Sequence, residues 1–326
     1  MTSKKIKWGI IGLGAISHDF VKDLLLVDEA ELYAVASRNK DKASEFAALY
    51  GVNKSYDSYD ALFKDETVDI IYIATPHHLH ASLSIQAIQK GKHVLCEKPM
   101  TINSEQAIRV MKNATNKNVF FMEALWSRFN PGIQKVLQLV KDGELGTINY
   151  LNADFSFWTK RDMTSRLFDM NLAGGALLDI GIYPLFLSYI ILGNPLEINA
   201  LAHLDKGGVD VQTAMLLKYE NAMANLFCGF MSDSDMIARI YGTEGSIFIP
   251  KDWYKSQGFT LVKNGEKQYF DLPTRGTGFY YEILECHKCI AEGKIQSELW
   301  SHQNSMELMQ LMDDIRNMIN LKYPFE

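Results

Sequence analysis

The sequence predicts an α/β fold in two parts: a doubly wound parallel sheet, followed by an α+β domain on a mostly antiparallel sheet. Three observations predict it. Strand and helix patterns alternate over the first 125 residues, long strand patterns dominate after about residue 145, and a glycine-rich turn follows the first strand. Alternation is typical of βαβ units, and strand runs with few helices are typical of α+β domains.

In the first part, short apolar runs rich in β-branched residues predict buried parallel strands. Amphipathic stretches between them predict helices. Asn103-Ser104 ahead of Glu105 predicts a helix start, and Gly51 and Gly91 predict helix ends. The expected strands are 7–11, 32–36, 68–74, 93–96 and 119–122, and the expected helices are 19–26, 40–50, 59–63, 78–90 and 104–113.

In the second part, strand patterns follow one another directly, and Asn264-Gly265 between two of them predicts a hairpin turn. We place the domain boundary between residues 125 and 126, so that a first domain covers 1–125 and a second covers 126–326. The expected strands are 147–158, 197–203, 211–219, 222–230, 237–249, 259–262 and 267–270, and the expected helices are 174–192, 279–292 and 306–320.

Composition narrows the class of protein. The chain of 326 residues carries 33 basic and 39 acidic side chains, a formal net charge of −6, which argues against a nucleic-acid binder. Four cysteines in a chain this long do not make a disulfide framework. The apolar run 176–192 contains Asp179 and Pro184 and falls short of a membrane span. We therefore expect a soluble cytoplasmic protein that acts on a small molecule.

The glycine-rich turn, Gly9 to Ser17, lies between the first strand and the first helix. Gly12 can make the tight turn, and Gly14 lets the backbone approach a pyrophosphate at the helix N-terminus. Ser17 stands where the dinucleotide fingerprint has its third glycine, and it is small enough for close packing. The alternative is a tight structural turn with no ligand. The residues expected at the cofactor here are Gly12, Leu13, Gly14, Ala15 and Ile16.

The end of the second strand predicts which nicotinamide cofactor is bound. NAD-binding chains usually carry an acidic residue about 20 residues after the turn, where it bonds the ribose 2′-hydroxyl. This strand ends in Ser37-Arg38 with no carboxylate. A hydroxyl and a planar guanidinium suit a 2′-phosphate, so we expect NADP rather than NAD. The alternative is a solvated arginine that opens a helix.

Two further motifs carry candidate catalytic groups. Glu97-Lys98-Pro99 follows a strand at the carboxyl end of the sheet, where doubly wound folds bind their ligands, although it could be a surface loop. Asp179 and Tyr183 are four residues apart, which places both on one face of a predicted helix. The alternative there is a solvent-facing aspartate with a packed tyrosine.

Taken together, these motifs resemble the glucose–fructose oxidoreductase and inositol 2-dehydrogenase (Gfo/Idh/MocA) family over nearly the whole chain. The resemblance rests on the glycine turn, Thr75-Pro76 with His80, Glu97-Lys98-Pro99 and the pair Asp179 and Tyr183. Most members carry histidine at the position of Tyr183. Tyrosine there, with segments 123–129 and 176–181, looks like the branch of dimeric dihydrodiol dehydrogenases and NADP-dependent D-xylose dehydrogenases.

The resemblance implies an NADP-binding Rossmann domain over 1–125 and a substrate-binding and dimerisation domain over 126–326. The second domain would contain a large open antiparallel sheet through which two copies form a homodimer. The resemblance also implies a mechanism. Tyr183 would accept the proton of a substrate hydroxyl while the carbinol carbon gives a hydride to the nicotinamide. A free tyrosine, with a pKa of about 10, is a poor base. The Lys98 ammonium would lower that pKa, and Asp179 would hold Lys98 or a second substrate hydroxyl.

The remaining site residues follow from the same resemblance or from aromatic content. Besides the turn, the expected cofactor contacts are Ser37, Arg38, Thr75, Pro76, His80, Glu97, Lys98, Trp126 and Arg128. The expected substrate contacts are Trp126, Phe155, Phe157, Asp179 and Phe279, although aromatic residues at strand spacing often belong to a core.

Other functions remain open at this stage. The alternatives are an NADPH-dependent reductase of a sugar or dicarbonyl, and a non-catalytic NADP-sensing protein. His77, His78 and His80, and Cys286 with Cys289, superficially resemble metal ligands. A structural zinc site normally needs four ligands at paired spacing, so we expect no metal.

Overall fold

The computed structural model describes residues 5–162 and 165–326, which form two compact units. The first unit extends to Trp126 and also contains Arg275–Met306. The second contains Ser127–Thr274 and Glu307–Glu326. The first crossing of the chain lies one residue from the boundary placed by sequence, whereas the return of residues 275–306 to the first unit was not predicted.

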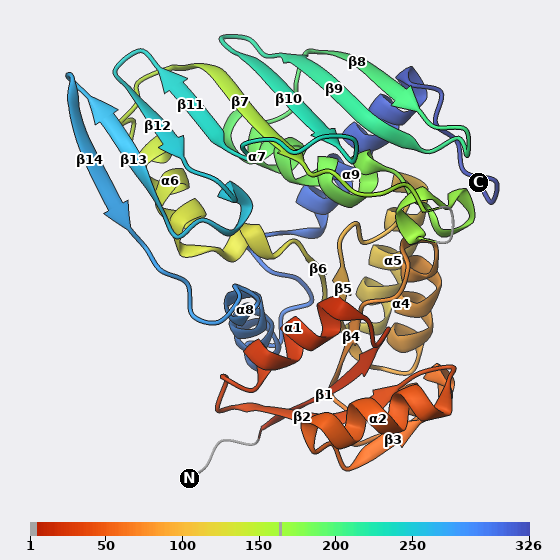
Figure 1. The fold of residues 1–326 in the computed structure, drawn as a ribbon. Helices are drawn as coiled ribbons and strands as arrows, with labels where there is room; N and C mark the ends of the chain where they lie inside the picture. The colour runs from red at the N-terminus through yellow and green to blue at the C-terminus, as the bar shows by residue number, and fades with distance from the viewer. Residues whose placement is uncertain (1–4, 163–164) are drawn as a thin grey trace. The chain divides into compact units, whose positions relative to one another are not determined.

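The first unit is built on a six-stranded sheet in which every strand pair is parallel (Figure 1). Its order is β3-β2-β1-β4-β5-β6, so the direction of winding reverses between β1 and β4. Ligands of such sheets bind at this switch point, beyond the carboxyl ends of the strands. The strands are β1 (Ile6–Ile11), β2 (Ala30–Ala36), β3 (Lys54–Tyr56), β4 (Ile70–Ile73), β5 (His93–Glu97) and β6 (Phe121–Ala124).

Helices cover both faces of this sheet because its strands are apolar on both sides. On one face, side chains of β1, β4 and β5 pack with α3, α4 and α5. On the other, Phe20 of α1 stacks on Tyr72 at 3.7 Å between ring centroids, and Trp8 donates to His287 of α8. The helices are α1 (Ala15–Leu24), α2 (Lys40–Tyr50), α3 (Tyr59–Phe63), α4 (His80–Gln89), α5 (Ser104–Lys117) and α8 (Tyr280–Ala291). Asn103 caps α5 as predicted.

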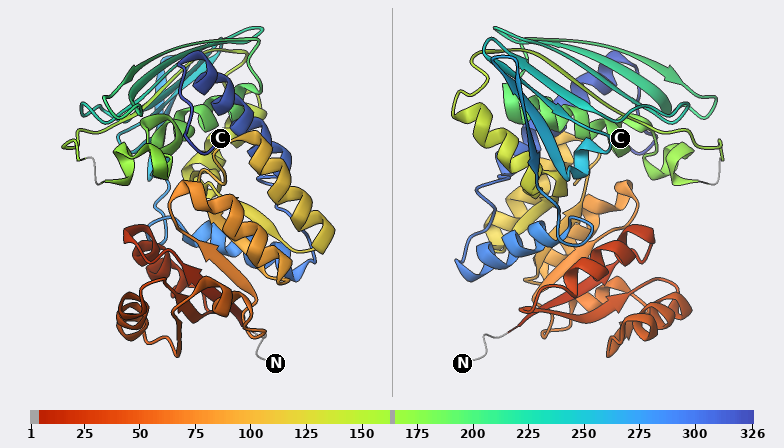
Figure 2. Two further views of the ribbon diagram at one scale, coloured as in Figure 1. Left: turned by 90° about the vertical axis from the view of Figure 1, so that its right-hand side faces the viewer. Right: turned by 60° about the vertical axis from the view of Figure 1, so that its left-hand side comes forward.

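The second unit is built on an eight-stranded sheet ordered β14-β13-β12-β11-β7-β10-β9-β8 (Figures 1 and 2). Only β7 and β10 are parallel among these neighbours, so the predicted mostly antiparallel sheet is confirmed. Asn264 and Gly265, at φ 53° and 79°, form the predicted hairpin turn. The strands are β7 (Ile148–Ser156), β8 (Glu197–Leu204), β9 (Asp210–Lys218), β10 (Met223–Gly229), β11 (Ala238–Gly242), β12 (Gly245–Ile249), β13 (Gly258–Lys263) and β14 (Glu266–Asp271).

The single strand predicted over 237–249 is wrong, because it is a hairpin of β11 and β12 that turns at Thr243 and Glu244. The reason lies in the tertiary structure. A Cβ on Gly242 would come within 2.1 Å of the Leu145 carbonyl oxygen, so the chain turns where only glycine fits.

The helices of the second unit differ from the predictions at two places. Helix α6 (Pro131–Lys141) was not predicted, although Asn130 caps it and Pro131 opens it. The helix predicted over 174–192 begins later, with a π-helical turn, η5 (Leu177–Gly181), followed by α7 (Ile182–Leu192). Its start is displaced because Gly174 packs against the Arg166 carbonyl and Gly175 takes φ +120°. Helix α9 (His302–Met318) begins in the first unit and ends in the second.

Residues 170–192 are long and apolar enough to cross a membrane by length and composition alone. However, 83% of the tested window is buried inside the protein, as in the core helix of a folded domain. Helix α7 packs on β7 and β10, which places its apolar side chains in the core of the second unit.

Candidate active site

The turn between β1 and α1 has the geometry of a phosphate-binding loop. Gly12 has φ +83°, and a Cβ there would lie 2.3 Å from the backbone of Ala74, so only glycine fits. The Ser17 hydroxyl donates to the Gly12 carbonyl at 2.7 Å and tightens the turn. Gly14 caps α1 without a side-chain hydrogen bond, and the first turn of the helix has no acidic residue. Leu13 is buried, whereas Ala15 and Ile16 are exposed beside the helix N-terminus.

A buried polar atom next to this turn also fits a bound cofactor. The Thr75 hydroxyl, just after β4, is buried and has no hydrogen-bond partner in the part of the chain that the structure describes. Such an atom costs free energy unless a ligand or water satisfies it. With the helix N-terminus nearby in the fold, the donor set suits the phosphates and ribose of a dinucleotide.

At the end of β2, Ser37 and Arg38 occupy the place that selects the cofactor. The Ser37 hydroxyl accepts the Asn39 backbone N–H at 3.1 Å, and Ser37 is nearly buried. Arg38 is exposed and forms no ion pair with any residue that the structure describes. Neither residue is acidic, so this end of β2 suits an anionic group.

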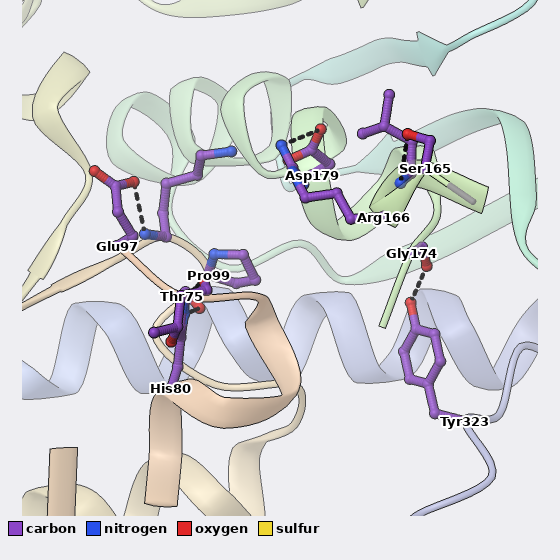
Figure 3. A network of polar contacts seen from close by, with 11 residues as sticks. Thr75, His80, Glu97, Pro99, Ser165, Arg166, Gly174, Asp179 and Tyr323 are labelled. Carbon is purple, nitrogen blue, oxygen red and sulfur yellow. Dashed lines mark hydrogen bonds and ion pairs between the residues drawn. The ribbon is translucent and has the colours of Figure 1, made fainter. Parts of the chain in front are cut away.

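The Lys98 segment follows β5 and is held by hydrogen bonds on several sides (Figure 3). Tyr72 donates to one oxygen of Glu97, and the other oxygen accepts the Lys98 N–H at 3.3 Å. The peptide between Lys98 and Pro99 is cis. His80 contacts the Pro99 carbonyl at 2.8 Å and the Thr75 carbonyl at 2.7 Å. Both ring nitrogens of His80 are therefore occupied by backbone.

In the second unit, Asp179 lies in the π-helical turn η5 and Tyr183 in the first turn of α7. Arg166 holds the Asp179 carboxylate with both ends of its guanidinium, at 3.0 and 3.5 Å (Figure 3). Asp179 is only 5% exposed, whereas half of the Arg166 side chain is exposed. The partner that a buried carboxylate requires is thus an arginine of the same unit.

The Tyr183 ring is fixed by two other aromatic rings. Phe155 lies 5.3 Å and Tyr254 5.4 Å from it between centroids, and Phe155 and Tyr254 stack on each other at 4.3 Å. Burial raises the pKa of the Tyr254 phenol. No motif singled out Tyr254, because its position beside Tyr183 depends on the course of the chain after β12. Only a high local density of aromatic residues could have suggested it.

The expected site residues are divided between the two units. In the first unit, Trp126 and Phe279 stack at 5.0 Å and are both buried. In the second, Phe157 packs between Phe155 and Phe230. The first unit holds Gly12, Leu13, Gly14, Ala15, Ile16, Ser37, Arg38, Thr75, Pro76, His80, Glu97, Lys98, Trp126 and Phe279, and the second holds Arg128, Phe155, Phe157, Asp179 and Tyr183.

The histidines and cysteines that superficially resemble metal ligands lie in separate segments, residues 77–80 and helix α8. Cys286 and Cys289 are buried free thiols in α8, and burial raises the pKa of both. Within residues 5–162 and 165–326, no group of three or more His, Cys, Asp or Glu side chains is placed to hold a metal ion.

A glycine turn before an acid-free helix N-terminus, at the switch point of a doubly wound sheet, is typical of dinucleotide-binding proteins, a class that includes the nicotinamide-dependent oxidoreductases. Two family models match this chain. The model of the oxidoreductase family with an NAD-binding Rossmann fold matches residues 6–125, and that of the GFO/IDH/MocA C-terminal domain matches residues 133–248. The chain belongs to the Gfo/Idh/MocA family, as the motifs predicted.

Named relatives agree on the class of reaction. The chain is 33% identical to trans-1,2-dihydrobenzene-1,2-diol dehydrogenase of Xenopus tropicalis, over 98% of this chain and 99% of the relative. The mouse enzyme of the same name is also 33% identical, over 98% of both chains. The chain also resembles the solved structure of KijD10, a 3-ketoreductase from Actinomadura kijaniata in complex with NADP and TDP-benzene. The TM-score is 0.88 and the sequence identity is 26%, over 97% of this chain and 98% of KijD10. The protein is therefore an NAD(P)-dependent dehydrogenase that acts on CH–OH groups.

Proposed function

We propose that this protein transfers a hydride between the carbinol carbon of a sugar or vicinal diol and NADP, with Tyr183 as the proton acceptor or donor. The observation that carries the proposal is the setting of Tyr183. Its ring is held by Phe155 and Tyr254, one helical turn after the ion pair of Asp179 and Arg166. The similarity to dihydrodiol dehydrogenases supports the choice of a diol or a sugar hydroxyl.

Each group has a defined task in this proposal. Tyr183 takes the proton of the reacting hydroxyl, and the Lys98 ammonium stabilises the phenolate form that this requires. Asp179, oriented by Arg166, accepts a hydrogen bond from a second substrate hydroxyl. The bound cofactor supplies the hydride chemistry, and the chain supplies orientation and electrostatics.

Substitution of Tyr183 tests the proposal directly. Tyr183→Phe keeps the ring that packs on Phe155 and Tyr254 but removes the proton-transfer group, so turnover should fall by about 100-fold or more while NADP binding is unchanged. The assay is nicotinamide fluorescence with a panel of D-xylose, other aldoses and a trans-dihydrodiol. Turnover near that of the wild type would contradict the role of Tyr183, and NADP binding without turnover of any substrate would favour an NADP sensor.

The preference for NADP over NAD rests on Ser37 and Arg38. Because a guanidinium pairs with a 2′-phosphate that NAD lacks, Arg38→Ala should weaken NADP binding by at least about tenfold and leave NAD binding nearly unchanged. Lys42→Ala, an exposed change on the neighbouring helix α2, is the matched control. Equal losses for both cofactors would refute the preference.

The same panel run with NADPH tests the reverse reaction. One structural relative is a 3-ketoreductase, which favours reduction of a keto sugar as a second activity at this site. Faster reduction of keto sugars than oxidation of any alcohol in the panel would make reduction the principal direction.

We also propose a homodimer through the open face of the eight-stranded sheet. This face exposes apolar side chains, among them Leu201 at 81%, Tyr269 at 60% and Leu216 at 44%. Exposed apolar side chains on a broad sheet face favour an interface. Light scattering should give twice the monomer mass of 37.0 kDa, and Leu201→Glu should shift the mass toward the monomer. A wild-type mass equal to that of the monomer would refute the dimer.

A further inference from the structure

A single peptide group, between Pro99 and Met100, is held at both ends by buried side chains. Its carbonyl oxygen lies 2.8 Å from Nδ1 of His80, and its N–H donates to an oxygen of Glu123 at 2.9 Å. This peptide group begins at the carbonyl of Pro99, the residue after Lys98. Glu123 lies in β6 and was part of the segment that resembled the family, but no role was predicted for it.

His80 bridges two backbone carbonyl oxygens. The carbonyl oxygens of Pro99 and Thr75 can only accept, so a ring N–H is the donor in a hydrogen bond to either of them. His80 is completely buried, so these contacts hold its ring at the carbonyl end of the peptide group.

Glu123 holds the N–H end of the same peptide group. It is 2% exposed, and its carboxylate accepts from three donors: the Met100 N–H, the Trp300 indole N–H at 3.1 Å and the Ser305 hydroxyl at 2.7 Å. An ionised carboxylate satisfies all three. Burial raises the pKa of the Glu123 carboxyl, while these hydrogen bonds and the charge of Lys98 act against that rise.

We propose that Glu123 is a positioning residue for Lys98, and that it acts with His80 through the peptide group between them. A ring N–H at the carbonyl oxygen and a carboxylate at the N–H polarise the amide in the same sense, which strengthens both hydrogen bonds. The peptide that follows Pro99 then has one orientation, and Lys98 emerges from it in one place. This inference rests on the proposed function, in which Lys98 assists Tyr183.

The same contacts tie together the ends of three neighbouring strands. His80 joins the Thr75 carbonyl after β4 to the segment after β5, and Glu123 joins that segment to β6. Trp300 and Ser305, which complete the Glu123 site, belong to residues 275–306. The return of this segment to the first unit thus helps to fix the loop that carries Lys98.

A double-mutant cycle tests whether Glu123 acts through Lys98. Glu123→Gln keeps the shape of the side chain but turns an NH₂ group toward a donor, so one hydrogen bond is lost. In the wild-type background kcat should fall by about tenfold, with a change of less than about threefold in the dissociation constant for NADPH measured by fluorescence titration. In a Lys98→Ala background, which itself should lose about 100-fold, Glu123→Gln should cause no further loss.

Two other variants keep the test decisive. Glu285→Gln alters a buried carboxylate of α8 that also accepts a serine hydroxyl, from Ser297. Among the described residues Glu285 forms no hydrogen bond with residues 97–100, so this variant should leave kcat unchanged. Where Glu123→Gln fails to fold, Ser305→Ala removes one donor at lower cost and should reduce kcat in the same direction, again only when Lys98 is present.

Each result has one interpretation. Equal losses from Glu123→Gln in both backgrounds would overturn the inference, because the substitution would then act through general stability. A loss that appears as weaker NADPH binding rather than lower kcat would overturn it as well. Full turnover by Lys98→Ala alone would instead refute the proposed function, since Lys98 would have no part in proton transfer.

Discussion

The Asp210 carboxyl should make the stability of the second unit depend on pH. One of its oxygens accepts the Leu177 N–H at 2.7 Å and the Thr213 hydroxyl at 2.8 Å, which caps the turn that carries Asp179. The other oxygen has no hydrogen-bond partner among the described residues. Burial raises the pKa of Asp210 to about 6, against the effect of these hydrogen bonds and of the Arg316 charge.

The size and sign of the effect follow from linkage. The ordinary pKa of this carboxyl is 3.8, so between pH 3.8 and about 6 the folded protein keeps a proton that the unfolded chain has released. Stability from this group is complete below pH 3.8 and is lost as the pH rises through 6. The gap between the two pKa values corresponds to about 3 kcal/mol. An amide at this position has no proton to lose in this range.

Urea unfolding of the wild type and of Asp210→Asn, at several values between pH 3.5 and 7, measures this effect. The free energy of unfolding of the wild type should fall relative to that of the variant by about 3 kcal/mol as the pH rises through the range. Asp19→Asn, which makes the same chemical change at a half-exposed residue of α1, is the matched control. Parallel pH dependences of the wild type and Asp210→Asn would refute the buried, protonated carboxyl.

Three further predictions concern single contacts. Asp23→Asn should lower the free energy of unfolding by about 2 kcal/mol in urea titrations, because the Asp23 carboxylate accepts the backbone N–H groups of residues 277, 278 and 280. An unchanged midpoint of the urea transition would contradict this. Gly175→Ala should lower the free energy of unfolding by more than about 3 kcal/mol, because φ is +120° and a Cβ would lie 2.2 Å from Asp210. Gly193→Ala is the control, since the space around Gly193 is open, and it should lower the free energy of unfolding by about 1 kcal/mol. Equal thermal shifts for the two variants would rule out the clash. Arg166→Met should reduce kcat by about tenfold or more, and Arg166→Lys should reduce it by less. Lysine keeps the positive charge beside Asp179 but loses the paired guanidinium hydrogen bonds. Equal kcat values for the two variants would show that the charge is irrelevant.

Most of the fold could be predicted from the sequence because its signals are local. The five predicted strands of the first unit and the Asn264-Gly265 hairpin depend on residues adjacent in the chain. Helix α6, which was not predicted, carries equally local signals, because Asn130 caps it and Pro131 stands at its first position. The hairpin of β11 and β12 was different, since its turn is set by the approach of the Leu145 backbone to Gly242.

The candidate site shows the same division. Short sequence motifs identify the candidate residues Gly12, Lys98, Asp179 and Tyr183. The partners that orient them were not found in this way. Tyr254, for example, contacts Tyr183 only because β12 and β13 bring residue 254 back toward α7, and no spacing along the chain encodes that contact.

Charge makes this division unavoidable for a buried site. A carboxylate or an imidazolium taken out of water needs several hydrogen bonds at once, and neighbours in the sequence seldom point at one atom. Glu123 obtains its donors from Met100, Trp300 and Ser305, across separations of 23, 177 and 182 residues. A motif can therefore reveal the group that meets the substrate, whereas the groups that hold it in place become visible only when the chain is folded. In this protein the groups that hold the site in place include Glu123, and its substitution should change the position of Lys98.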